Sequence, residues 1–452
     1  MKPLVWESCG DGDCARLTVP LRHADPAGET IELVVARGSL ADPDKRIGTL
    51  LLNPGGPGAP GTDFVVPAAK LLPDAITDYF DIVSWDPRGT GESSPVDCGR
   101  NFDYLFAADS APDNAVEQRE LEAATARFAR ECSQRSSRLL PNITSLATVS
   151  DMDMLREALG EDKLTYLGFS YGTYLGALYA REFPARVRAM MLDGAVDPSL
   201  SVETMVIEQA QGFGRALDLF LTYCARNRDC AFRHGGEPRR ALDVLRARVD
   251  LQPIASGDRT LGPTQLDLAL GAGLYGGELG YSELARSLRD AERGDPDGLL
   301  AVFDAYVGRN PDGIYKPDWA AFISISCADG PVLDLEAARV LQERAAVAAP
   351  DFGAENVGLG FPCSFWSAPP TNKVPGVVVA SGSVPIVVIG TTDDPATPLK
   401  WSEGLAKQLG VGRLVAVRGS AHTSLLGGPD CLARLAAAYL VDLVVPQDGT
   451  RC

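Results

Sequence analysis

Ser170 stands in a Gly-x-Ser-x-Gly pattern, an arrangement whose residue types and spacing favour nucleophilic chemistry. Gly168 and Gly172 flank it, the apolar run 164–169 leads into it, and apolar residues at helical spacing follow it. In a nucleophile elbow the serine occupies a sharp strand-to-helix turn that exposes its hydroxyl, and the glycines prevent a steric clash there. The pattern alone is common, but a strand before it and a helix after it are the context that an elbow requires. We therefore predict that Ser170 is a nucleophile.

A serine nucleophile needs a base to take its proton and a carboxylate to hold that base in the right tautomer. The chain has only three histidines, His23, His234 and His422. His23 precedes the main strands and His234 lies in a polar loop, whereas His422 follows the late apolar strand 413–417. Serine hydrolases with the chain order serine, acid, histidine place the base at such a position. The predicted base is therefore His422.

Two neighbouring aspartates compete for the role of the acid. Asp393 and Asp394 both follow the predicted strand 384–390, and sequence spacing does not separate them. A pair of carboxylates for glycoside chemistry would leave the elbow and the histidine unexplained. The residues thus favour a serine, histidine and aspartate triad whose acid is one of these two.

Neither a cofactor nor a metal is expected. Residues 271–276 formally match the Gly-x-Gly-x-x-Gly pattern of dinucleotide sites, but the residues before them look helical rather than extended. The pattern therefore fails the context test for such a site. A metal site lacks support because no two histidines are near each other in the sequence.

The glycine-rich loop 53–58 directly follows the predicted strand 47–52. Such glycine density lets backbone N–H groups point into a site without obstruction by side chains. In a serine hydrolase one of these N–H groups serves as an oxyanion donor, and the residue after the nucleophile, here Tyr171, supplies the other. A second polar loop, 86–93, contains Arg88, which we expect to form a structural ion pair that holds this loop.

The strand patterns predict an α/β fold with a mostly parallel central sheet flanked by helices. The strand 164–169, the elbow helix and the strand 189–194 form a strand–helix–strand unit, which makes the sheet parallel. Helical patterns then dominate until strand patterns resume in the last part of the chain. We therefore expect a core in two parts, 1–198 and 375–452, with a helical cap inserted at 199–374.

Charge and hydropathy limit the partners. The 452 residues include 42 Lys and Arg against 60 Asp and Glu, a net charge of −18. This charge argues against nucleic acid or an anionic membrane surface as a partner. No apolar run approaches the roughly 18 residues of a membrane span. The expected partner is a small peptide or ester substrate, and the oligomeric state is left open.

The cysteines indicate an oxidising compartment. There are ten of them, an even set that could pair consecutively along the chain, and none is in a Cys-x-x-Cys pattern. Structural disulfides are therefore the better interpretation. No signal-peptide pattern opens the sequence, so the chain is either cytoplasmic or a mature form, and we favour a secreted or extracytoplasmic protein. The cysteines are Cys9, Cys14, Cys98, Cys132, Cys224, Cys230, Cys327, Cys363, Cys431 and Cys452.

Five motifs together resemble the secreted tripeptidyl aminopeptidases of the SlpD/SlpE type, relatives of proline iminopeptidase within the α/β hydrolases. The similarity spans nearly the whole chain and implies the α/β-hydrolase fold. It also implies that Asp394 is the acid, and that Gly56 or its neighbour Gly55 is the oxyanion glycine, partnered by the N–H of Tyr171. The motifs are 53–58, 86–91, 168–173, 192–198 and 394–398.

Two departures from the resemblance concern the substrate more than the mechanism. Proline iminopeptidases usually have histidine where this chain has Pro54, and glycine commonly follows the catalytic histidine where this chain has Thr423. The resemblance implies an aminopeptidase that releases short peptides or residues from free N-termini by an acyl-enzyme mechanism. Such an enzyme needs an anionic group for the substrate ammonium, and the candidates are Asp329, Glu208 and Glu278.

Two alternatives to an aminopeptidase are a different hydrolase and a non-catalytic binding protein. An esterase or lactonase could use the same triad on a small hydrophobic ester, because this fold hosts many activities. A non-catalytic binding protein would be expected to lose a member of the triad. None is lost here, so an enzyme is predicted.

Overall fold

A ten-stranded sheet forms the centre of the molecule, in a computed structural model that describes residues 2–452. Its strand order is β1-β2-β3-β5-β4-β6-β7-β10-β11-β12, and every pairing from β5 to β12 is parallel. The antiparallel strands β1 to β3 lie at one edge. The strands are β1 (Glu7–Cys9), β2 (Gly12–Pro20), β3 (Thr30–Ser39), β4 (Gly48–Asn53), β5 (Phe80–Trp85), β6 (Leu164–Phe169), β7 (Val187–Asp193), β10 (Ile386–Thr391), β11 (Gly412–Val417) and β12 (Thr450–Arg451).

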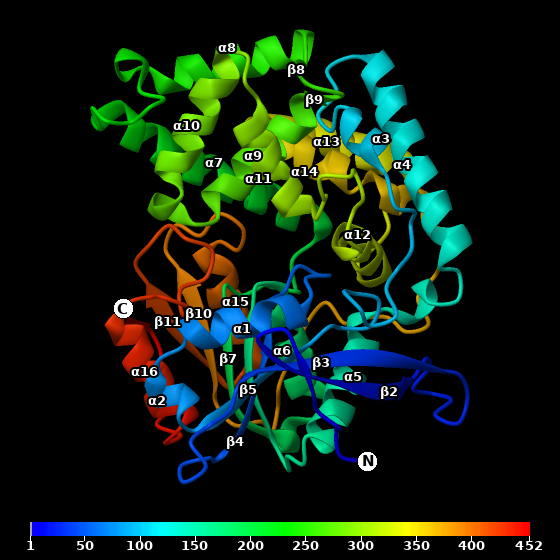
Figure 1. Cartoon of the computed structure of the whole chain (residues 1–452), viewed down its shortest axis with the longest axis vertical. Coiled ribbons are helices and arrows are strands. Elements are labelled where there is room, and N and C mark those ends of the chain that lie inside the picture. Colours follow the sequence, from blue (N-terminus) through cyan, green and yellow to red (C-terminus); the bar gives the residue numbers. More distant parts are fainter. Residues whose placement is uncertain (1) are drawn as a thin grey trace.

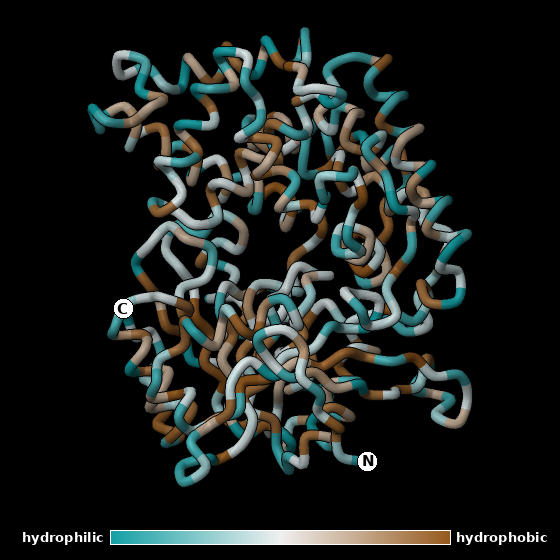
Figure 2. The backbone as a smooth tube through the Cα atoms, in the orientation of Figure 1, coloured by the Kyte–Doolittle hydropathy of each residue, from teal (hydrophilic) through white to brown (hydrophobic). Residues whose placement is uncertain are grey.

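The middle of the sheet is buried on both faces. All residues of β4, β5, β6 and β10 are buried, as continuous apolar runs in a parallel sheet require. Figure 2 shows these strands as a hydrophobic centre in the lower half of the molecule. The mostly parallel sheet predicted from the sequence is confirmed.

Helices cover both faces of this sheet. The helices α1 (Gly61–Leu71), α2 (Asp74–Thr77) and α16 (Asp430–Leu440) pack on one face. On the other face lie α5 (Ser145–Ala158), α6 (Tyr171–Glu182) and α15 (Leu399–Leu409). Each face has its own apolar core, because successive side chains of a strand point to opposite sides.

Between β7 and β10 the chain leaves the sheet and forms a helical segment, the upper half of Figure 1. One short hairpin, β8 (Ile254–Ser256) with β9 (Arg259–Leu261), was not expected from the sequence. The Gly-x-Gly-x-x-Gly residues lie at the end of helix α9, as the context test predicted. The cap boundaries 199 and 374 stay a prediction. The helices of this segment are α7 (Val202–Arg226), α8 (Pro238–Leu251), α9 (Pro263–Leu274), α10 (Tyr281–Glu292), α11 (Asp297–Val307), α12 (Asp318–Asp329), α13 (Leu335–Ala348) and α14 (Gly353–Leu359).

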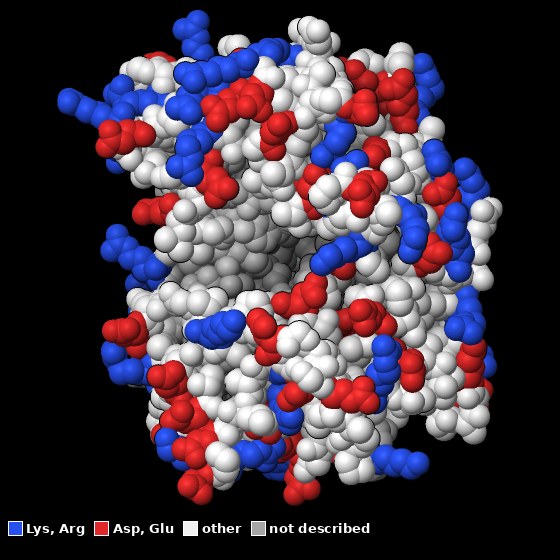
Figure 3. Space-filling model, in the orientation of Figure 1, with Lys and Arg blue, Asp and Glu red and all other residues white. Residues whose placement is uncertain are grey.

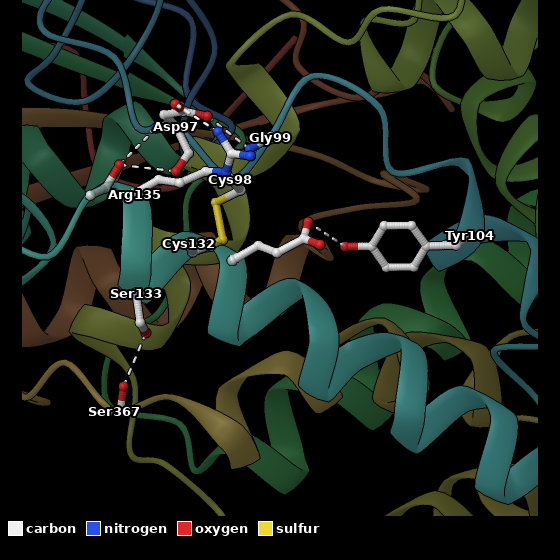
Figure 4. Close-up of a disulfide and its surroundings, with 10 residues drawn as sticks. Asp97, Cys98, Gly99, Tyr104, Cys132, Ser133, Arg135 and Ser367 are labelled. Carbon is white, nitrogen blue, oxygen red and sulfur yellow. Dashed lines mark hydrogen bonds and ion pairs between the residues drawn. A yellow bond between two sulfur atoms is a disulfide. The ribbon is translucent and has the colours of Figure 1, made fainter.

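The excursion between β5 and α5 packs against this helical segment. It contains α3 (Asp103–Ala107) and α4 (Ala115–Arg135), and α4 runs along the side of the molecule in Figure 1. Figure 4 shows the disulfide between Cys98 and Cys132 that ties α4 to the preceding loop. Beside it, the hydroxyl of Ser367 donates a hydrogen bond of 3.0 Å to that of Ser133.

All ten cysteines are paired, consecutively along the chain. The expected disulfides are present, and no free cysteine remains among the described residues. None of the helices within residues 2–452 is long and apolar enough to cross a membrane. The pairs are Cys9–Cys14, Cys98–Cys132, Cys224–Cys230, Cys327–Cys363 and Cys431–Cys452.

The ion pair expected of Arg88 is confirmed. Its guanidinium is fully buried and donates two hydrogen bonds to Asp151 of α5, at 2.7 and 2.6 Å. It also bonds backbone carbonyls at the end of β2, including that of Leu21 at 2.9 Å. A buried charge must be paired and fully bonded, and this one fixes the loop after β5 to α5.

Candidate active site

Ser170 lies in a strained turn between β6 and α6. Its φ is 52° and its ψ is −124°, a left-handed backbone that side-chain-bearing residues rarely adopt. The N–H of Ser170 donates to the carbonyl of Asp193 at 2.9 Å. A Cβ on Gly168 would lie 2.4 Å from the carbonyl oxygen of Gly172, so a larger residue at 168 would push strand and helix apart. The local geometry is that of a nucleophile elbow.

Asp394 holds the imidazole of His422. The Nδ1 atom of His422 lies 2.9 and 3.1 Å from the two carboxylate oxygens of Asp394. Asp394 is 1% exposed and accepts further hydrogen bonds from the backbone N–H groups of Ala396 and Thr397. Asp393 is exposed and makes no contact of this kind. The structure therefore brings Asp394, and not its neighbour, to the histidine.

The second ring nitrogen of His422 is left for a substrate or a nucleophile. Nε2 is buried and has no hydrogen-bond partner within the described residues. Burial opposes charge on the imidazole, but Asp394 and Asp193 outweigh it, so the pKa of His422 is raised above its ordinary value. With Nδ1–H donating to Asp394, Nε2 is the nitrogen that can accept a proton.

Asp193 connects the candidate nucleophile to the histidine loop. Its backbone carbonyl accepts the N–H of Ser170, while its side chain accepts the N–H groups of Ser424 at 2.9 Å and Leu425 at 2.8 Å. The side chain is fully buried, and this burial raises the pKa of Asp193 to about 6. Sequence reasoning missed this residue, although an aspartate at the end of a predicted strand beside the elbow was a signal.

The two glycines considered for the oxyanion hole differ in what their N–H groups do. The N–H of Gly55 donates to the side chain of Asn53 at 3.0 Å and is already bonded. A Cβ on Gly55 would lie 2.9 Å from both the Cβ of Ser170 and the N of Tyr171, so this loop contacts the elbow directly. The N–H of Tyr171 belongs to the first turn of α6, where no intrahelical acceptor exists. The N–H of Gly55 is thus occupied, and Gly56 with Tyr171 stays the predicted pair of donors.

Comparisons with known proteins agree with this geometry. Residues 48–257 match the family model described as alpha/beta hydrolase fold, and residues 349–452 match the one described as TAP-like protein. Serine protease Hip1 of Mycobacterium tuberculosis is 35% identical over 100% of this chain and 91% of its own length. Carboxylesterase B of the same species is 33% identical, over 99% and 89%. Tripeptidyl aminopeptidase of Streptomyces lividans is 28% identical, over 93% and 81%.

The chain belongs to the α/β-hydrolase family. It is a hydrolase, and the resemblance stated from its motifs is confirmed by these relatives. Their high coverage means that the similarity includes the helical segment of this α/β hydrolase as well as its sheet.

The helical segment reaches the site of this α/β hydrolase at its histidine. The N–H of His422 donates to the carbonyl of Tyr275 at 2.8 Å, and the two rings meet edge to face with centroids 5.2 Å apart. Figure 3 shows that the surface between the α/β part and the helical segment is deeply hollowed, with few charged residues on the visible walls. The residue after the histidine, Thr423, has a φ of 68°, a left-handed backbone that favours glycine.

The three carboxylates proposed to receive a substrate ammonium lie in separate places. The hydroxyl of Tyr171 donates to Asp329, whose other oxygen accepts the N–H of Ser145 at 2.9 Å. Glu208 pairs with Lys400 at 2.7 Å and accepts the indole N–H of Trp401 at 2.6 Å. Two of the three are therefore already engaged by other groups.

Glu278, the third candidate, is exposed next to Gly277. A Cβ on Gly277 would lie 2.7 Å from the hydroxyl of Ser420, so this turn packs on the histidine loop. Glu278 therefore lies near the histidine loop, but no described contact aims its carboxylate at the candidate triad.

Proposed function

We propose that this α/β hydrolase is a serine peptidase in which Ser170, His422 and Asp394 form the catalytic triad. The observation that carries the proposal is the histidine: its Nδ1 is held by a buried carboxylate, and its Nε2 is buried without a partner. This arrangement fixes the tautomer that can take a proton from a serine hydroxyl. The strained serine at the end of β6 supplies that hydroxyl.

The mechanism follows from these positions. His422 Nε2 takes the proton as Ser170 Oγ attacks the scissile carbonyl, and the oxyanion accepts hydrogen bonds from the N–H groups of Gly56 and Tyr171. When the intermediate collapses, His422 gives the proton to the leaving amine, which departs. A water molecule then attacks the acyl-enzyme by the same route, releasing the acid and restoring Ser170.

The substrate proposed is a short peptide with a free N-terminus, cleaved by an aminopeptidase. Relatives named serine protease and tripeptidyl aminopeptidase support this choice. A second candidate, an esterase or lactonase acting on a small hydrophobic ester, is supported by the relative named carboxylesterase B. Both activities use the same triad, so they differ only in what the helical segment admits.

One experiment separates these candidates. The purified chain is assayed with an N-terminally free tripeptide anilide, with its N-acetylated twin and with a simple aryl ester. An aminopeptidase cleaves the free peptide far better than the blocked one, and equal rates on both would overturn that assignment. Ser170→Ala should lower kcat on every substrate by about 10⁴-fold or more, and a fully active variant would exclude the mechanism.

We also propose that the protein works outside the cytoplasm. Five disulfides pair all ten cysteines, and disulfides form and persist in oxidising compartments. Mass spectrometry of alkylated protein from native cells tests this. Ten alkylated cysteines without reductant would contradict it.

A further inference from the structure

A row of aromatic groups leads from His422 into the helical segment. The ring of Tyr275 lies 5.2 Å from that of His422, and Tyr306 follows with its centroid 6.0 Å from Tyr275. The two tyrosine hydroxyls share a hydrogen bond. Tyr306, on α11, keeps 40% of its surface exposed, so the far end of this row reaches the surface.

A buried carboxyl lies at the far end of this row. Glu355, on α14, is 3% exposed, and its Oε1 atom has no hydrogen-bond partner within the described residues. Its charge would act on Tyr306, raising the pKa of that hydroxyl after the larger effect of burial. Phe352, at the start of α14, packs on Phe213, which packs on Tyr275, with ring centroids 5.8 and 5.6 Å apart, so α14 lies beside this row.

The groups that face Glu355 are mostly acidic. Asp267 of α9 and Asp109 of the loop before α4 both act on it, and Arg246 of α8 is the cation that faces it. Arg246 is already engaged, with hydrogen bonds of 2.9 Å to Asp267 and 3.0 Å to Asp351. The hydrogen bonds of this arginine thus go to Asp267 and Asp351, and none goes to Glu355 within the described residues.

Such a cluster is unfavourable unless a proton or a cation completes it. Burial and then Asp267 raise the pKa of Glu355 well above its ordinary value, which favours the protonated carboxyl when no cation is present. Burial likewise raises the pKa of Asp109 to about 6. A cation entering from the side of Tyr306 would give the unpartnered oxygen of Glu355 the partner that the chain does not supply.

The length of the aromatic row from His422 to Tyr306 suits a short peptide. Three extended residues span roughly 10 Å, which is comparable to the two ring-to-ring steps of 5.2 and 6.0 Å between His422 and Tyr306. A peptide whose third carbonyl lies at Ser170 therefore has the length to reach Tyr306, the tyrosine on which the Glu355 carboxyl acts. Its side chains would lie along Tyr275 and Tyr306.

We propose that Glu355, supported by Asp267 and Asp109, receives the α-ammonium group of a peptide of about three residues. This inference rests on the proposed aminopeptidase function and replaces the three carboxylates considered from the sequence. Asp329, Glu208 and Glu278 have other partners or lie at the surface, whereas Glu355 has an oxygen without one.

The test compares Glu355→Gln with two other variants. Glu343→Gln changes an exposed acid on the neighbouring helix α13, and Asp329→Asn changes the sequence-based candidate. The measured quantity is kcat/KM for the free tripeptide anilide divided by kcat/KM for its N-acetylated twin. Rates are normalised to the amount of serine labelled by a phosphonate inhibitor.

Glu355→Gln should reduce this ratio by about tenfold or more, mainly through KM on the free peptide. Glu343→Gln should leave the ratio unchanged, and Asp329→Asn should affect both substrates equally. An unchanged ratio in Glu355→Gln overturns this inference while leaving the aminopeptidase function standing. A ratio near one in the wild-type protein instead overturns the proposed function itself.

A second measurement does not depend on how Glu355→Gln folds. A free tripeptide amide is bound to Ser170→Ala protein at a pH of about 6.5, where its α-amino group is charged. Calorimetry in two buffers of different ionisation enthalpy counts the protons released. Because Glu355 should lose its proton when the ammonium binds, the free peptide should release protons and the N-acetylated peptide should not. Equal proton release for both peptides contradicts the proposal.

Discussion

The hydroxyl of Tyr171 donates a hydrogen bond to the carboxylate of Asp329, which joins the residue after Ser170 to helix α12 of the helical segment. The same segment reaches the other side of the site, where the carbonyl of Tyr275 accepts the N–H of His422 at 2.8 Å. A proposed oxyanion donor and the proposed base are therefore both supported from the helical segment. The site is complete only with that segment in place.

Removing the Tyr171 hydroxyl should weaken this support. In Tyr171→Phe the backbone N–H remains, but Asp329 and Ser145 lose a shared partner, which costs about 1–3 kcal/mol when buried polar groups are left unpaired. We expect a lower free energy of unfolding and a several-fold lower kcat. Tyr174→Phe is the matched control, because the Tyr174 hydroxyl has only a 3.4 Å contact with the carbonyl of Pro375. Denaturant unfolding and steady-state kinetics measure both; equal effects in the two variants would contradict the prediction.

The charge of Asp193 should set the acid limb of the pH profile. Activity requires neutral His422, and Asp193 is one of the two charges that raise the pKa of His422 against the effect of burial. In Asp193→Asn the acceptor oxygen for Ser424 and Leu425 is kept but the charge is lost. The pKa of His422 should fall, so kcat/KM should persist to lower pH.

The control for this shift is Asp197→Asn. Asp197 is also buried after β7, but it bonds Ser199 and Gln408 instead of the histidine loop. Its profile should match that of the wild-type protein. A shift of the acid limb to higher pH in Asp193→Asn, or no shift at all, would refute the role given to this carboxylate.

Features encoded by neighbouring residues were predictable from the sequence. The elbow could be recognised because the apolar run of β6, the two glycines and the helix after them are adjacent in the chain. His422 could be chosen because histidines are so few. Both depend on local order, which a single sequence displays directly.

Contacts between distant residues were not predictable. Asp193 meets Leu425 across 232 residues, and no local pattern reports such a contact. Glu208 looked as available as any other carboxylate until the fold brought Lys400 to it. The unpartnered oxygen of Glu355 was equally hidden, because burial without a partner is a property of the packed helices and not of the chain.

A methyl group at position 55 should disrupt the site without unfolding the protein. The backbone of Gly55 has a φ of 97°, and a Cβ there would lie 2.5 Å from the carbonyl oxygen of Phe169. Gly55→Ala should therefore displace the loop from the elbow and lower kcat by about 100-fold or more, the usual effect of losing an oxyanion donor. Gly160→Ala is the control, since its φ of 79° is similarly strained but nothing lies within 4 Å of the added atom. Loss of activity in both variants would point to backbone strain and not to the contact with Ser170.

The disulfide between Cys327 and Cys363 should stabilise the support of the oxyanion donor. It joins Cys327 of α12, two residues before Asp329, to Cys363 in the helical turn Phe361–Phe365. Replacing both cysteines by serine should lower the free energy of unfolding by about 2–4 kcal/mol and reduce kcat, because the helix carrying Asp329 loses its covalent tie. The pair Cys9 and Cys14 closes a five-residue separation at the sheet edge, far along the chain from the triad, so its double serine variant should keep full kcat. Thermal unfolding and kinetics of the two double variants test this, and a loss of kcat confined to the Cys9 and Cys14 variant would show that the tie at α12 does not serve the site.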